Sequence, residues 1–176
     1  MNRSFWTKVT ATSAPASVIL VRLVVGLVFL SEGLQKFMFE ALGPGRFERI
    51  GFPAPHALAY FVACFEVICG TLLVVGLATR LAAIPLIIVM LTAIITTKIP
   101  ILIGHDLWGF HVHKLSHYGF WMMAHEARAD FSMLLGSIFL AIVGAGRWSM
   151  DACLTRRRPA SSPTVDHAPG GGEENP

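Results

Sequence analysis

Charged residues and cysteine are both scarce in this sequence of 176 residues. Lys, Arg, Asp and Glu make up 14% of the chain, whereas an ordinary soluble domain carries about 25% of such residues. The net charge of +3 is too small and too scattered to indicate a nucleic-acid surface. Cys64, Cys69 and Cys153 form no C-x-x-C pair, so the thiol pair of a membrane thiol oxidoreductase is missing.

Apolar residues are abundant instead, at 54% of the chain, and they are concentrated in four blocks. About 20 apolar residues are needed to cross a hydrocarbon core as a helix, and none of the blocks alternates as a strand would. The short turn from Gly76 to Arg80 makes the second and third blocks antiparallel neighbours. We therefore predict an all-α fold, an integral membrane four-helix up-down bundle, with spans at about 18–38, 57–77, 81–104 and 130–150.

Basic residues predict the orientation of the bundle, because cytoplasmic connections carry an excess of Lys and Arg. In an up-down bundle one face receives Arg3, Lys8, Arg80, Arg147, Arg156, Arg157 and Arg158. We expect a cytoplasmic segment at 1–17, a membrane domain at 18–152 and a disordered cytoplasmic tail at 153–176, which is rich in Pro, Gly and Ser. Arg22 and Arg80 are expected to be cytoplasmic anchors that extend to the membrane interface.

Polar residues within the first span form the first candidate site. Glu32, Gln35 and Lys36 stand at i, i+3 and i+4 and therefore share one helical face. Counted at about 1.5 Å per residue, Glu32 lies roughly 9 Å below the outer end of its span. Asp130 enters the same outer half from the start of the fourth span.

The second span adds one carboxyl to this group. Glu66 belongs to a stripe of small residues formed by Ala59, Ala63 and Gly70, and small residues let helices approach closely in lipid. Glu66 should therefore face another helix, at a depth of roughly 13 Å. The polar cluster of Glu32, Gln35, Lys36, Glu66 and Asp130 has two interpretations: salt bridges that fix helix packing, or a polar cavity that binds a small molecule or relays protons.

Five histidines lie between the third and fourth spans, at positions 105, 111, 113, 117 and 125. His111 and His113 suit an extended metal clip, and His113 with His117 would share a helical face. Copper, zinc or haem iron could each be accommodated, although no neighbouring carboxylate or thiolate completes a set of ligands. The alternative is an interfacial segment, where histidine and aromatic residues are common.

Three stretches of the chain resemble the DoxX family of small bacterial membrane proteins. They are RLVVGLVFLSEGLQKF at 22–37, FEVICGTLLVVGLATRLAA at 65–83, and the closing stretch at 130–151 that includes GAGRWSMD. The resemblance implies a four-helix membrane bundle in the bacterial inner membrane. It further implies an accessory role beside membrane oxidoreductases, since the family takes its name from a quinone-linked sulfur oxidation system.

The resulting hypothesis is an accessory or quinone-interacting subunit of a membrane oxidoreductase system. Glu32, Lys36 and Glu66 would line a quinone site, because a quinone needs proton donors beside its carbonyls and an apolar path for its tail. The chain would be an enzyme only as a component of such a system, with quinone as the one organic cofactor implied. The alternatives are a small-solute transporter and a cargo-binding or assembly factor. Expected partners are the lipid bilayer, oxidoreductase subunits and a second copy of the chain, without nucleic acid.

Overall fold

The computed structural model describes residues 14–112 and 114–156, without the side chains of the last two. This part of the chain is helical throughout, apart from an isolated bridge between Leu107 and Phe110. The elements are α2 (Val18–Met38), α3 (Pro44–Ile50), α4 (Pro55–Val75), α5 (Thr79–Ala93), a π-helical turn η1 (Ile94–Lys98), α6 (Ile99–Ile103), α7 (Phe120–Val143) and α8 (Met150–Arg156). The all-α class predicted from the sequence is therefore confirmed for the described residues.

Three helical segments of the described chain are long and apolar enough to cross a membrane. They are Val18–Met38, Pro55–Val75 and Thr79–Ile103, the last formed by α5, η1 and α6 in succession. A helix of 21 residues is about 32 Å long at 1.5 Å per residue, which matches a hydrocarbon core of about 30 Å. The first three predicted spans agree with these helices to within two residues at each end.

The fourth long helix differs from its prediction. α7 begins at Phe120 and ends at Val143, whereas the sequence analysis placed the fourth span at about 130–150. The polar residues from His125 to Asp130 do not interrupt a helix, because none of them is Pro or Gly. Gly144 and Gly146 end it, both at positive φ. α8 also extends three residues beyond Cys153, so the start of the predicted disordered tail is helical; residues 1–13 and 157–176 lie outside the described part.

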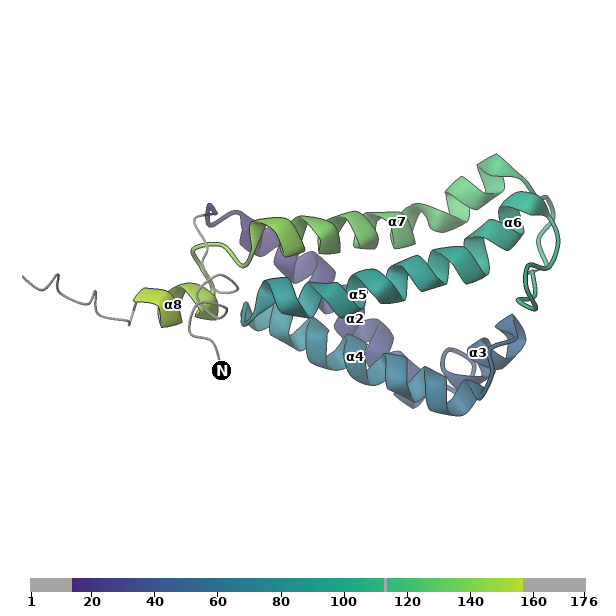
Figure 1. Cartoon of the computed structure of the whole chain (residues 1–176), viewed down its shortest axis with the longest axis horizontal. Helices are drawn as coiled ribbons and strands as arrows, with labels where there is room; N and C mark the ends of the chain where they lie inside the picture. Colours follow the sequence, from purple (N-terminus) through teal and green to yellow (C-terminus); the bar gives the residue numbers. More distant parts are fainter. Residues whose placement is uncertain (1–13, 113, 157–176) are drawn as a thin grey trace, which may run out of the picture.

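The four long rods pack as two pairs. α2 packs extensively on α4 and α5 on α7, and smaller contacts join α4 to α5 and α2 to α7. The turn between α4 and α5 lies at one end of the molecule near α8, whereas α3 and α6 lie at the other end (Figure 1). We call these the turn end and the α3 end.

Glycine allows the close approach of α2 to α4. A Cβ atom added to Gly26 would lie 3.0 Å from the Gly70 carbonyl oxygen, and one added to Gly70 would lie 2.9 Å from the Gly26 oxygen. Ala59 and Ala63 are fully buried on the same side of α4. The predicted stripe of small residues is therefore confirmed as the α4 face that contacts α2.

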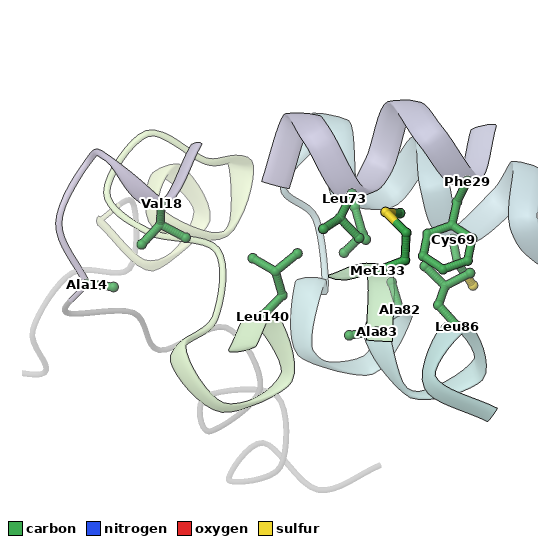
Figure 2. Packing of buried hydrophobic residues seen from close by; sticks show 11 residues of the cluster. Ala14, Val18, Phe29, Cys69, Leu73, Ala82, Ala83, Leu86, Met133 and Leu140 are labelled. Atoms are coloured by element: carbon green, nitrogen blue, oxygen red, sulfur yellow. The ribbon is translucent and has the colours of Figure 1, made fainter. Parts of the chain in front are cut away.

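The apolar core lies towards the turn end. Leu73, Leu86 and Leu140 are fully buried and come from α4, α5 and α7, and Phe29 of α2 and Met133 join the same cluster (Figure 2). The α4–α5 turn that brings these helices together is closed by Gly76 in the left-handed conformation, at φ 76°. Glycine adopts this conformation without the strain that a side chain would add.

Candidate functional site

The centre of the site is an ion pair between two helices. Lys36 Nζ of α2 lies 2.7 Å from Glu66 Oε2 of α4, and both side chains are buried. Gly33 lets the two helices meet here, because a Cβ atom at this position would lie 3.0 Å from both Ala63 O and Glu66 Cβ. Glu32 lies 3.7 Å from the same ammonium, and its side chain is about half exposed. The sequence analysis placed these three groups together, and the geometry agrees with that placement.

A cavity of about 400 Å³ adjoins this ion pair. Most of its lining is apolar, and its polar lining residues are Glu32, Lys36, Arg46, Glu66, Thr92, Thr96, Thr97 and Asp130. The wall is formed by α2, α3, α4, α5, η1 and α7, so the cavity lies between the two helix pairs. Its volume and its mixture of apolar walls with a few polar groups are typical of a small-molecule site.

Several apolar side chains of the cavity wall also reach the outer surface of the helices. Phe61 of α4 is 60% exposed, Ile88 of α5 is 59% exposed and Val28 of α2 is 39% exposed. In a bilayer these surfaces lie against lipid chains. The cavity wall is therefore continuous with the lipid-facing surface, which an apolar ligand tail requires.

Asp130 of the cavity lining takes part in a second ion pair. Lys98 Nζ, at the end of η1, lies 3.1 Å from Asp130 Oδ2 of α7, and the Lys98 side chain is buried. The hydroxyl groups of Thr96 and Thr97 donate to backbone carbonyl oxygens one turn earlier, at 2.8 and 2.6 Å. π-helical turns of this kind occur frequently at functional sites.

Sequence reasoning missed Lys98 and Arg46 as site residues. Lys98 was not included in the predicted polar cluster, although a lysine within the apolar run 81–104 indicates a buried charge. Arg46 lies in a loop-like sequence between Gly43 and Gly51 and gave no comparable signal. The structure brings it into the lining through the short helix α3.

Gln35 and Asp130 are placed differently from the single polar cluster expected. Gln35 Nε2 donates to Ser31 O on its own helix at 3.2 Å and does not line the cavity. Asp130 does line the cavity, but it pairs with Lys98 and has no ion pair with the α2 residues. Positions 32, 35 and 36 share one face of α2, but only Glu32 and Lys36 line the cavity.

Arg22 and Arg80 lie at the turn end, away from the cavity. Arg22 was expected to extend to the membrane interface but is buried: its guanidinium donates to Ala145 O at 2.7 Å and Trp148 O at 2.9 Å. Arg80 donates to Val143 O at 3.4 Å. Both side chains bind the backbone around the end of α7, so they hold helices together.

Asp151 of α8 also joins two helices at the turn end. Its carboxylate accepts hydrogen bonds from the backbone N–H groups of Ala78 at 2.8 Å and Thr79 at 3.2 Å, which caps the start of α5. Burial raises the pKa of this carboxyl, although the two backbone hydrogen bonds and the charge of Arg22 act in the opposite direction. This pKa shift belongs to a packing contact and not to the cavity.

The histidine-rich connection forms a hairpin closed by an aspartate. Asp106 accepts from the backbone N–H of Val112 at 2.7 Å and contacts His111 Nδ1 at 2.9 Å. The hydrogen bond with His111, followed by that with Val112, holds the pKa of Asp106 below its usual value. His117 is exposed, and His113 lies outside the described residues. The described part of the chain contains no group of three His, Cys, Asp or Glu side chains that could hold a metal ion, so the predicted clip of His111, His113 and His117 gains no support from it.

Comparison with known proteins shows the family of the chain. The DoxX family model matches residues 17–99, which include α2, α3, α4 and α5. Uncharacterized membrane protein Rv3486 of Mycobacterium tuberculosis is 51% identical over 88% of this chain and 91% of its own length. The chain belongs to the DoxX family. It is a membrane protein, as the resemblance in its sequence predicted.

A second relative of this DoxX protein carries a functional name. The protein named "Putative oxidoreductase CatD" of Bacillus subtilis is 31% identical over 76% of this chain and 83% of its own length. No solved structure matches the chain.

Proposed function

We propose that this DoxX protein is a quinone-interacting subunit of a membrane oxidoreductase system. The observation that carries the proposal is the Lys36–Glu66 ion pair, buried at 2.7 Å on the wall of a largely apolar cavity of about 400 Å³. A quinone headgroup is flat and apolar with two carbonyl acceptors, and its tail is a hydrocarbon. It therefore fits a cavity whose wall continues onto the lipid-facing surface at Phe61 and Ile88.

The ion pair supplies the proton chemistry that a quinone requires. Reduction of a quinone to a quinol takes two electrons and two protons; in this proposal a partner redox subunit supplies the electrons. The Lys36 ammonium donates a hydrogen bond, and then a proton, to a ring oxygen as negative charge develops on it. Glu32, half exposed and 3.7 Å from the ammonium, takes up a proton from the aqueous phase and passes it to Lys36, and a second passage along the same route completes the quinol.

The name of the Bacillus subtilis relative supports an association with redox chemistry. The proposal assigns electron transfer to the partner and quinone binding to this chain. The cavity and the carboxyl and ammonium groups on its wall support only this narrower role.

We further propose that α7 is a fourth crossing, so that residues 18–152 form a four-helix up-down domain. Its 24 residues span about 36 Å at 1.5 Å per residue. Arg22, near the start of α2, binds carbonyl oxygens just beyond the end of α7, so the chain returns to the end from which it started. An excess of basic residues on this side favours the cytoplasm for both termini in a bacterial inner membrane.

Binding of a short-chain quinone to the purified protein in mild detergent tests the proposed function. Glu66→Gln keeps the side-chain volume but removes the charge that orients Lys36, and we expect affinity to fall at least about tenfold, or 1.4 kcal/mol. Glu48→Gln is the matched control, because Glu48 is an exposed carboxyl that does not line the cavity. Quinone-dependent turnover in membranes should be lost in the first variant and retained in the second.

Two results would reject the proposal. One is equal quinone affinity in wild type and Glu66→Gln, with circular dichroism showing that both are folded. The other is uptake of a polar solute into liposomes without any electron acceptor, abolished by Glu66→Gln, which would identify a transporter instead.

A further inference from the structure

The Arg46 guanidinium is the cationic group of the cavity wall that has no hydrogen bond or ion pair to the described part of the chain. The two lysines nearby are already engaged, Lys36 with Glu66 and Lys98 with Asp130. Arg46 lines the same cavity, and its charge acts on the Glu66 carboxylate. An arginine presents five N–H donors in a rigid plane. These donors are available to a ligand in the cavity.

The helix α3, which carries Arg46, is joined to the histidine-rich hairpin. The backbone N–H of His111 donates to Ile50 O at 2.8 Å, which joins the hairpin to the last residue of α3. The rings of Phe52 and Phe110 pack with centroids 5.0 Å apart, and Phe47 of α3 packs on Phe52 at 5.2 Å.

The hairpin itself is closed by Asp106 through its contacts with His111 and Val112. Without the hairpin, α3 would be held mainly by its packing on the start of α4. The hairpin is thus a positioning element for the side chains that α3 carries.

We propose that Arg46 binds the ring oxygen of the quinone at this end of the cavity, and that with Lys36 it favours an oxygen bearing negative charge. This inference rests on the proposed function and names the ligand class that the site prefers: an aromatic quinone with an ionised oxygen. Carboxylates cannot supply this preference, because quinone oxygens are acceptors and ionised carboxylates have no proton to donate. Two cations that converge from α2 and α3 do supply it.

Two small quinones of nearly the same shape test the preference. 1,4-Naphthoquinone is neutral, whereas 2-hydroxy-1,4-naphthoquinone carries an ionised hydroxyl at neutral pH. We expect the wild-type protein, titrated by calorimetry in mild detergent, to bind the ionised ligand about tenfold more tightly, which corresponds to one charge-assisted hydrogen bond.

Arg46→Gln should abolish this difference in affinity between the two ligands, while it lowers the affinity for the neutral ligand by less than about threefold. Arg49→Gln is the matched control on the same helix, because the Arg49 guanidinium donates to Ala41 O at 2.7 Å and does not line the cavity. Asp106→Asn, which loosens the hairpin, should remove part of the preference without changing a residue of the cavity. Arg46→Lys, which keeps the charge but not the planar donors, should restore only part of it.

The results separate failure of this inference from failure of the proposed function. If both ligands bind the wild type in a Glu66-dependent manner but Arg46→Gln keeps the preference, the role of Arg46 is wrong and the quinone site stands. Equal losses of the preference in Arg46→Gln and Arg49→Gln would show a general surface-charge effect and would also overturn the role of Arg46. If the wild type binds neither ligand, the quinone function itself fails and the inference fails with it.

Discussion

Replacement of the Lys36–Glu66 pair by methionine tests whether the two charges act as a unit in the folded protein. Lys36 is 8% exposed and Glu66 is 2% exposed, so either single substitution leaves the other charge in a low-dielectric environment. Breaking a buried pair in this way costs about 3 to 5 kcal/mol of unfolding free energy. Glu66→Met should lie near 3 kcal/mol, at the lower end, because Glu32 remains 3.7 Å from the ammonium.

The double variant should behave very differently from the sum of its parts. Replacing both members of a buried pair by apolar residues of similar volume is often neutral or stabilising. We therefore expect Lys36→Met with Glu66→Met to lie within about 1 kcal/mol of the wild type, with an interaction energy of about 3 kcal/mol or more. Glu32→Gln, at a half-exposed site, should cost about 1 kcal/mol or less.

Reversible unfolding with sodium dodecyl sulfate in mixed micelles, followed by circular dichroism, measures these free energies. Additive effects of the two methionine substitutions would refute the reasoning, because additivity would mean that the charges do not interact in the folded state. The double variant should also lose quinone binding despite its restored stability. That combination would separate a packing role of the pair from its role in the cavity.

The packing of α2 on α4 and the acid response of the turn end give two further predictions. Gly70→Ala places a Cβ atom 2.9 Å from Gly26 O, so it should lower the free energy of unfolding by about 1 to 3 kcal/mol, despite the helix preference of alanine. The same unfolding assay measures this change, and equal or greater stability would contradict the close contact. Because burial raises the pKa of Asp151 above its ordinary value of 3.8, the folded state binds the proton more tightly than the unfolded state. The contribution of Asp151 is therefore most favourable below pH 3.8 and decreases as the pH rises through the folded pKa, and Asp151→Asn should remove this part of the pH dependence.

The sequence was sufficient to predict the elements whose signal is local. Composition and block length located α2, α4 and the α5–α6 rod, because a helix in lipid must satisfy its own backbone hydrogen bonds over about 20 residues. The stripe of small residues around Glu66 predicted a helix-facing carboxyl, since helical periodicity places positions three and four apart on one face. The sequence analysis placed Glu32 and Glu66 at similar depths, and Lys36 follows Glu32 by one turn on the same helical face.

The features that the sequence did not predict depend on contacts distant in the chain. Arg46 enters the cavity because α3 folds over it and the hairpin holds α3 there, and no periodic pattern in residues 40–56 carries that information. Lys98 ends a π-helical turn within a continuous rod and pairs with Asp130 of another helix, and neither feature has a local sequence pattern. Arg22 was assigned by its depth alone, but two of its acceptors, Ala145 O and Trp148 O, lie more than 120 residues away in sequence.

Each helix pair carries one lysine–carboxylate bridge on its side of the cavity. Lys36 and Glu66 join α2 to α4, while Lys98 and Asp130 join η1 to α7. Both charges of each bridge come from the same helix pair, so neither bridge crosses the space between the pairs. The buried leucines and the Gly76 turn hold α4 and α5 together at the opposite end. At the α3 end, the wall is instead held by the backbone hydrogen bond from His111 to Ile50 O, which joins the hairpin to the helix that carries Arg46.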